Sequence, residues 1–225
     1  MLKKIKKISI ALIVIILITT IAGIIFRIYK SSTGEIKPMK IDVSGSGANL
    51  VFNFSINRYI AQYNLYYRKD NNKDYLPSAN GTNSYNFKED EKIITFPELA
   101  ITTDGYSDKV RRITIAFDWH SYSKPILDKH GMMCYYALRT VFQDLSNDEI
   151  RKLYSKAMDI GYENPRDEWY NFDSAVPYAL FYKGNVGVYT YFALGQSEYF
   201  CIIPITEDVI TNYSNKGVHI FKLDR

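Results

Sequence analysis

The stretch VRRITIAFDW, residues 110–119, decides the fold because its pattern identifies a strand with two different faces. Its apolar positions are Ile113, Ile115, Phe117 and Trp119, and they alternate with Thr114, Ala116 and Asp118. A period of two places each set on its own side of a sheet. The pattern therefore predicts a half-buried strand, with the apolar set in the core and the second set in solvent.

Other strands are predicted on both sides of this one. Their ranges are 92–96, 98–103, 178–182, 187–193 and 198–203, with an edge strand at 218–223. The polar residues 70–91, which include Asn80-Gly81, are expected to form a loop. Short turns separate most of these ranges, which is typical of strands that pair with their sequence neighbours.

Capping residues predict the helices. Ser55 is expected to cap a helix that ends near Arg68, with Phe54 and Tyr59 as its hydrophobic staple. Ser146 and Glu149 form a capping box, and Gly161 is expected to end that second helix. A further helix is predicted at 131–143, after a loop that includes residues 122–127, and a short one follows Thr206.

The order of these elements predicts an α+β domain. It runs helix, three strands, two helices and three strands, which favours an antiparallel sheet with helices packed on one face. Both halves begin with a stapled serine cap and continue to a set of strands. The sequence therefore leaves open whether residues 50–130 and 131–225 are two copies of a duplicated unit.

An uncharged run at the N-terminus, ISIALIVIILITTIAGIIF, covers residues 8–26. About 20 apolar residues are needed to cross a bilayer as a helix. We expect a transmembrane signal anchor over residues 8–28, with Ile8, Ile16 and Phe26 in the hydrocarbon. The run is longer than the apolar part of an ordinary cleaved signal peptide and lacks a small-residue cleavage site. This favours an uncleaved anchor.

Charged residues around this run predict its orientation. Four lysines precede it, whereas only Arg27 and Lys30 follow closely. The excess before the run predicts a cytoplasmic tail at residues 1–7 and an extracytoplasmic domain at 50–225, joined by a Ser- and Gly-rich linker at 29–49. Residues 1–30 carry six cations and no acid, so the chain's formal charge of +4 leaves −2 on residues 31–225. No nucleic-acid partner is therefore expected.

The candidate chemistry lies in DWHSYSKPILDKH, residues 118–130. It contains Asp-x-His twice, as Asp118 with His120 and Asp128 with His130. Oxygen and imidazole ligands suit zinc or a similar divalent ion, provided that the intervening loop brings the pairs together. The competing interpretation is a polar loop without a metal, because Lys124 and Lys129 add positive charge. We assign no cofactor.

Three other motifs carry weaker hypotheses. Cys134 and Cys201 lie in apolar surroundings and are expected to be buried thiols, with a disulfide as the alternative. Residues 164–173 combine Asp167, Glu168 and Asp173 with aromatic residues, and this segment could bind a peptide or glycan or, with paired carboxylates, hydrolyse a glycosidic bond. The Gly45–Gly47 segment lacks the lysine and third glycine of phosphate-binding loops, so it is not taken as one.

Three functions remain open from the sequence. The first is a single-pass membrane protein with a non-enzymatic binding or assembly domain on the outer face of a bacterial membrane. Its partners would be the lipid bilayer and either another envelope protein or a wall polymer. The alternatives are an oligomeric component of a secretion or transfer machine, and a metal-dependent enzyme built on Asp118, His120, Asp128 and His130.

Overall fold

A computed structural model describes residues 38–71, 78–79, 83–89, 92–118, 123–165, 176–193 and 197–223. Residues Pro38–Arg225 form one compact unit. The predicted anchor and cytoplasmic tail lie outside the described residues. None of the helices in the described ranges has both the length and the apolar composition to cross a membrane.

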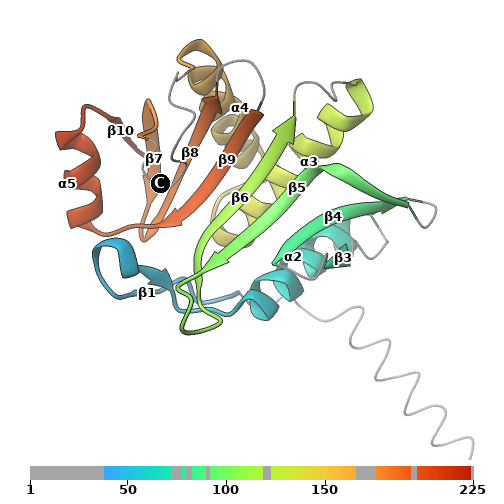
Figure 1. The fold of residues 1–225 in the computed structure, drawn as a ribbon, viewed down its shortest axis with the longest axis horizontal. Coiled ribbons are helices and arrows are strands. Elements are labelled where there is room, and N and C mark those ends of the chain that lie inside the picture. Colours follow the sequence, from blue (N-terminus) through green and yellow to red (C-terminus); the bar gives the residue numbers. More distant parts are fainter. Residues whose placement is uncertain are drawn as a thin grey trace, which may run out of the picture. The chain divides into compact units, whose positions relative to one another are not determined.

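One large sheet organises the unit, and the α+β class is confirmed. Its eight strands run in the order β10-β7-β8-β9-β6-β5-β4-β3 (Figure 1). The strands are β3 (Ser78–Ala79), β4 (Ser84–Glu89), β5 (Lys92–Thr103), β6 (Val110–Asp118), β7 (Ala179–Lys183), β8 (Val186–Ala193), β9 (Ser197–Pro204) and β10 (His219–Lys222). All neighbours are antiparallel except β10 and β7, which are parallel. The prediction of an antiparallel sheet was therefore wrong at this edge.

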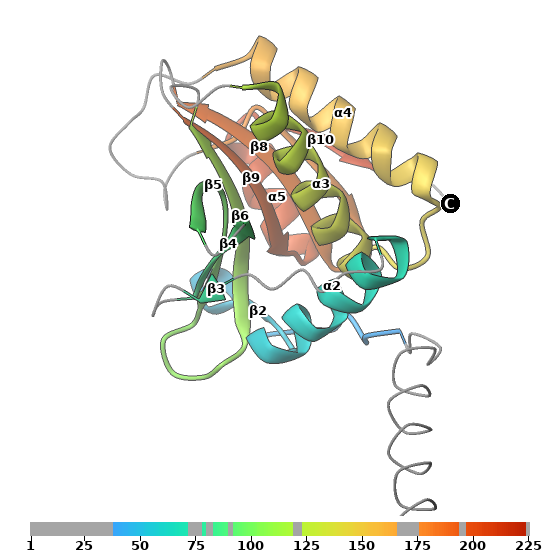
Figure 2. The same cartoon turned by 90° about the vertical axis from the view of Figure 1, so that its right-hand side faces the viewer.

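Three helices cover one face of this sheet, as Figure 2 shows. They are α2 (Ile56–Asn71), α3 (Lys124–Val141) and α4 (Asn147–Glu163). The fourth helix, α5 (Glu207–Asn215), lies on the opposite face. Tyr213 of α5 packs on Tyr189 of β8, whereas the next strand residue, Thr190, meets Gly161 of α4. Successive strand residues point to opposite faces, so the prediction that all helices share one face was wrong for α5.

The capping interactions at the starts of α2 and α4 form as the sequence indicates, but α4 continues past Gly161, its predicted end, to Glu163. The Ser146 hydroxyl accepts from the Glu149 amide at 3.3 Å, and the Ser146 amide donates to the Glu149 carboxylate at 2.7 Å. Ser55 accepts from the amide of Arg58 at 3.2 Å. The rings of Phe54 and Tyr59 stack with centroids 5.9 Å apart. Both predicted helix starts are confirmed.

The start of α3 differs from the prediction. This helix begins at Lys124 with Ser123 as its N-cap residue, so residues 124–130 are helical rather than part of a loop. Pro125 lies in the first turn of α3, where proline is tolerated because no amide donor is needed.

Three strand boundaries also differ from the sequence prediction. Strand β4 lies within the expected polar loop, and β5 continues through Pro97 to join two ranges that were predicted apart. Pro97 falls where the β4–β5 register shifts and no partner is paired with it, so its missing amide removes no ladder bond there. Residues 38–49, expected to be linker, contribute β1 (Val43–Ser44), which pairs with β2 (Val51–Phe52), and the 3₁₀ turn η1 (Gly47–Asn49).

Strand β6 lies at the centre of the core. Its apolar positions Ile113, Ile115 and Phe117 are fully buried under the helices, as predicted. The other face was expected to be wet, but Thr114 is only 6% exposed because Cys201 of β9 lies beside it. A second apolar cluster therefore forms on this face. It comprises Leu180, Tyr189, Tyr191, Cys201 and Val218, with Tyr213 packed against it.

Close packing between α4 and β8 depends on Gly161. A Cβ at this position would lie 2.9 Å from Thr190 Cβ and from a ring carbon of Phe192. We expect Gly161→Ala to lower the free energy of unfolding by a net 1 kcal/mol or so, because overpacking costs about 1–3 kcal/mol and exceeds the helix-propensity gain of about 1. Urea titration of the full chain in detergent measures this. The exposed Ser155→Ala on the same helix is the control, and an unchanged or raised stability for Gly161→Ala would contradict the packing.

Candidate functional site

Three of the four residues predicted as metal ligands, Asp118, Asp128 and His130, lie in the described part of the chain. Asp118 ends β6, and His120 lies outside the described residues. Asp128 is exposed and pairs with Lys124 at 2.7 Å, whereas His130 is fully buried. Both belong to α3, where residues two apart project from different sides of the helix. The expectation that Asp128 and His130 leave one loop together was wrong, and the described ranges contain no group of three or more His, Cys, Asp or Glu placed to hold a metal ion.

His130 instead belongs to a buried group that we call the histidine cluster, formed with Cys134, Tyr154 and Glu198. Its Nε2 lies 3.4 Å from Glu198 Oε1 and 3.5 Å from Cys134 Sγ. Its Nδ1 lies 3.4 Å from the Tyr154 hydroxyl. The cluster joins α3 and α4 to β9, beneath the ring of Phe117.

Burial keeps these groups uncharged. It raises the pKa of Glu198 to about 8 and lowers the pKa of His130 to about 3. Burial also raises the pKa of the Cys134 thiol, with a further contribution from Glu198. At neutral pH the thiol is therefore protonated.

This arrangement is not that of a nucleophilic triad. A triad needs the nucleophile and the acid on opposite ring nitrogens, but Cys134 and Glu198 both approach Nε2. All three side chains are fully buried. Cys134 and Cys201 are both free thiols, so the predicted alternative of a disulfide was wrong.

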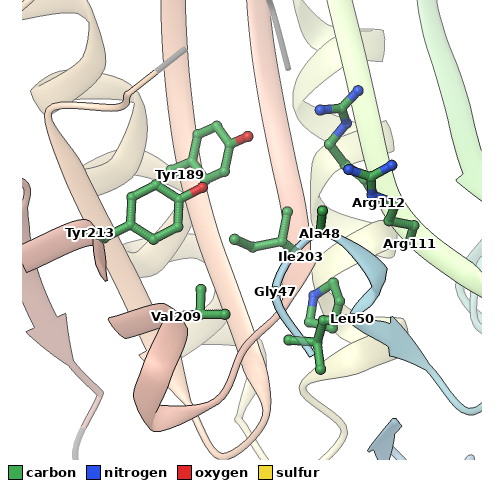
Figure 3. Close-up of a pocket in the computed structure, with 10 residues that line it drawn as sticks. Gly47, Ala48, Leu50, Arg111, Arg112, Tyr189, Ile203, Val209 and Tyr213 are labelled. Atoms are coloured by element: carbon green, nitrogen blue, oxygen red, sulfur yellow. The ribbon is translucent and has the colours of Figure 1, made fainter. Parts of the chain in front are cut away.

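A second site lies on the other face of the sheet, and a β-bulge creates it. Thr103 pairs with Val110 and Thr102 pairs with Arg112, so Arg111 is an extra residue on β6. Strand residues normally alternate between faces, but a bulge changes the direction of a side chain. Arg111 and Arg112 consequently line one cavity, as Figure 3 shows.

We call this cavity the arginine pocket, and its volume is about 140 Å³. The two arginines come from β6, Tyr189 comes from β8 and Tyr213 comes from α5 (Figure 3). The remaining lining is Gly47, Ala48, Leu50, Ile203, Pro204 and Val209. The pocket thus combines two guanidinium groups and two phenols with an apolar floor.

The described lining of this pocket carries charge of one sign. Arginine is protonated at every physiological pH, and the lining residues that the structure describes include no aspartate or glutamate. Burial raises the pKa of Tyr189 well above its ordinary value and raises that of Tyr213, while Arg112 opposes both shifts. The phenols therefore keep their protons and remain donors. The pocket can hold a carboxylate or phosphate group, whose oxygens accept from arginine in a fork.

The Gly45–Gly47 segment shapes one wall of this pocket. Gly45 has φ +87°, and a Cβ there would lie 2.2 Å from the backbone oxygen of Asn49. Only glycine fits this turn. The Gly45–Gly47 segment lacks the lysine of a phosphate-binding loop. The fold nevertheless places Gly47 and Ala48 beside the arginines of β6.

Sequence reasoning did not identify the arginine pocket. Two adjacent arginines at the start of a strand were visible, but alternation predicts that they face opposite sides. The bulge that overrides this alternation depends on the register with β5, and strand composition does not reveal that register. The acidic and aromatic residues at 166–173, also considered for binding, lie outside the described residues.

The histidine cluster predicts a pH dependence of stability. For Glu198 the folded-state pKa is raised from about 4.5 to about 8, so its contribution is fully present below pH 4.5 and is lost as the pH rises to 8. For His130 the pKa is lowered from about 6.5 to about 3, so its contribution is present above pH 6.5 and is lost as the pH falls to 3. The two effects cancel between pH 4.5 and 6.5. Stability should therefore fall on both sides of that range.

Glu198→Gln tests this dependence, because the amide does not titrate. We expect wild-type unfolding free energy to drop by about 2 kcal/mol between pH 6.5 and 8, at about 1.4 kcal/mol per pH unit. The drop should disappear in Glu198→Gln and persist in the exposed control Glu207→Gln. Urea titrations across this range give the slopes. An equal slope in wild type and Glu198→Gln would show that this carboxyl is not the titrating group.

Comparison of the chain with protein-family models, with curated proteins and with solved structures gave no match.

Proposed function

We propose that this chain is a single-pass membrane protein of a bacterium that presents a non-enzymatic binding domain outside the cytoplasm. The uncharged run at residues 8–26 and the lysines before it support the anchor and its orientation. The compact unit that begins at Pro38 provides the domain. Its role is to bind or assemble with another envelope protein or a wall polymer.

The observation that carries this proposal is the arginine pocket. Arg111 and Arg112 line a cavity whose other described lining residues are uncharged, so a bound anion would make favourable interactions with both guanidinium groups. The volume of about 140 Å³ suits a single anionic group with a small apolar attachment. A carboxylate at the end or on a side chain of a protein partner has this chemistry, and so does a phosphate on a wall polymer.

The histidine cluster supports a role without catalysis. The histidine cluster is fully buried at His130, Cys134 and Glu198. A substrate has no access to these atoms, and burial keeps the groups in their uncharged forms. The partly exposed polar side chains of the arginine pocket are Arg111, Arg112 and Tyr213, which would bind an anion without exchanging protons near neutral pH.

Paired variants test the arginine pocket directly. Acetate and inorganic phosphate should each raise the unfolding temperature of the full chain in detergent, because a ligand that binds only the folded state stabilises it. Replacing both Arg111 and Arg112 by glutamine should weaken binding by at least about tenfold, since hydrogen bonds to charged groups contribute about 1.5–3 kcal/mol.

The matched control is Lys109→Gln. This variant removes a cation that directly precedes β6 but is not among the described residues that line the pocket. It should retain the full effect of both anions. Phosphate also stabilises proteins by general exclusion from their surface, so only the difference between variants is informative. Equal responses of wild type and the double arginine variant would contradict the proposal, and the comparison of acetate with phosphate distinguishes carboxylate from phosphate recognition.

A reporter fusion tests the proposed topology. Alkaline phosphatase joined after Arg225 should be active in intact cells, because it folds with its disulfides only outside the cytoplasm. Green fluorescent protein fused at the same position should not fluoresce, because it would be exported. Fluorescence together with inactive phosphatase would place the domain in the cytoplasm and contradict the orientation.

A further inference from the structure

A second cavity lies between the three helices, on the face of the sheet opposite the arginine pocket. Its volume is about 460 Å³, within the range of small-molecule sites. The C-terminal end of α2 contributes Asp70, α3 contributes Tyr135 and Tyr136, and α4 contributes Asn147, Arg151 and Tyr154. We call this cavity the tyrosine pocket.

Aromatic rings form much of its surface. The rings of Tyr135 and Tyr136 meet edge to face with centroids 5.0 Å apart. The Arg151 guanidinium lies 5.8 Å from the centroid of Tyr135. Tyr154 packs directly against α3, because a Cβ built on Gly131 would lie in ordinary van der Waals contact with the Tyr154 hydroxyl at 3.5 Å. Tyr154 also approaches His130 through that hydroxyl, which links the wall of the pocket to the buried core.

Polar groups at the rim are held in defined orientations. The Tyr136 hydroxyl donates to Asp70 at 3.2 Å and accepts from the Asn71 amide at 2.8 Å. Asn147 accepts from Arg139 through its Oδ1, which leaves its Nδ2 to donate. The pocket thus presents a carboxylate acceptor, an amide donor and the guanidinium of Arg151 around aromatic faces.

The charges of the described lining of this pocket balance, unlike those of the arginine pocket. Asp70 supplies one negative charge and Arg151 one positive charge among the lining residues that the structure describes. Burial raises the pKa of Tyr136 to about 12 and raises that of Tyr154 further, so both phenols remain neutral. A ligand with net charge therefore gains no overall attraction here. A neutral ligand with many donors and acceptors matches the mixture of polar groups.

We propose that the tyrosine pocket binds a neutral sugar unit of a glycan. The apolar face of a pyranose ring would pack on Tyr135, and its hydroxyl groups would donate to Asp70 and accept from Asn147 and Arg151. The volume holds one or two such rings. This site is separate from the arginine pocket, and its ligand does not depend on the function proposed for that pocket.

The test is a titration of the full chain with the neutral disaccharide of N-acetylglucosamine, in a detergent that has no sugar headgroup. Binding is followed by calorimetry, and we expect it to be saturable. Tyr135→Ala should weaken it by roughly tenfold, because the apolar face of the sugar loses the aromatic ring on which it packs. Arg151→Gln, at a side chain that is 70% exposed, should weaken it without affecting the fold.

Tyr106→Ala is the matched control, because Tyr106 is 99% exposed and lies outside the pocket. It should bind as wild type does. The double arginine variant of the other pocket should also bind as wild type, so that failure at one site is distinguishable from failure at the other. Absence of saturable binding would overturn the proposal, and so would equal weakening by Tyr106→Ala. A zwitterionic dipeptide that binds where the disaccharide does not would also overturn it.

Discussion

The pairing of β6 with β9 is the constraint on which the rest of this structure depends. Residues 113–118 pair in an unbroken antiparallel register with residues 197–202, and this joins the meander β4-β5-β6 to the meander β7-β8-β9. The join aligns Ile113 with Ile202 and Ile115 with Phe200 on one face, where α3 and α4 pack. Without the β6–β9 pairing, each half would have an exposed apolar sheet edge. Its core would also be too small for independent stability.

Both candidate sites follow from how the two faces of this joined sheet are covered. On one face, three helices meet above the core and leave the tyrosine pocket between their exposed edges. On the other face, α5 covers the strands near β8, while β6 retains a bulge that presents Arg111 and Arg112 beside them. The arginines lie at the boundary between covered and uncovered sheet, where a charged side chain keeps contact with solvent while its pocket is partly apolar.

Local physics made much of the fold predictable. The capping box at Ser146 and the staple at Phe54 involve residues a few positions apart, so the sequence alone identified the starts of α4 and α2. The alternation in residues 113–117 likewise identified the core face of β6. The strand order adds that two meanders meet at β6 and β9, an arrangement that a duplicated unit would also produce. The duplication of residues 50–130 and 131–225 stays a prediction.

Nonlocal contacts account for what could not be predicted. The parallel pairing of β10 with β7 and the placement of α5 depend on residues far apart in the chain. His130 looked like a ligand beside Asp128 because the helical start at Lys124 was hidden by Pro125. The arginine pocket required a register shift against β5, and only the paired strands reveal that shift.

Methyl NMR of the full chain in detergent, during titration with acetate, tests whether the arginine pocket binds an anion. Methyl groups of Ala48, Leu50, Ile203 and Val209 line the arginine pocket, whereas those of Ile113 and Ile150 lie in the core on the other face. We expect saturable chemical-shift changes that are confined to the methyl groups of the arginine pocket. These changes should be lost when both Arg111 and Arg112 are replaced by glutamine. Shifts that spread evenly over both groups, or that persist in the double variant, would contradict this expectation.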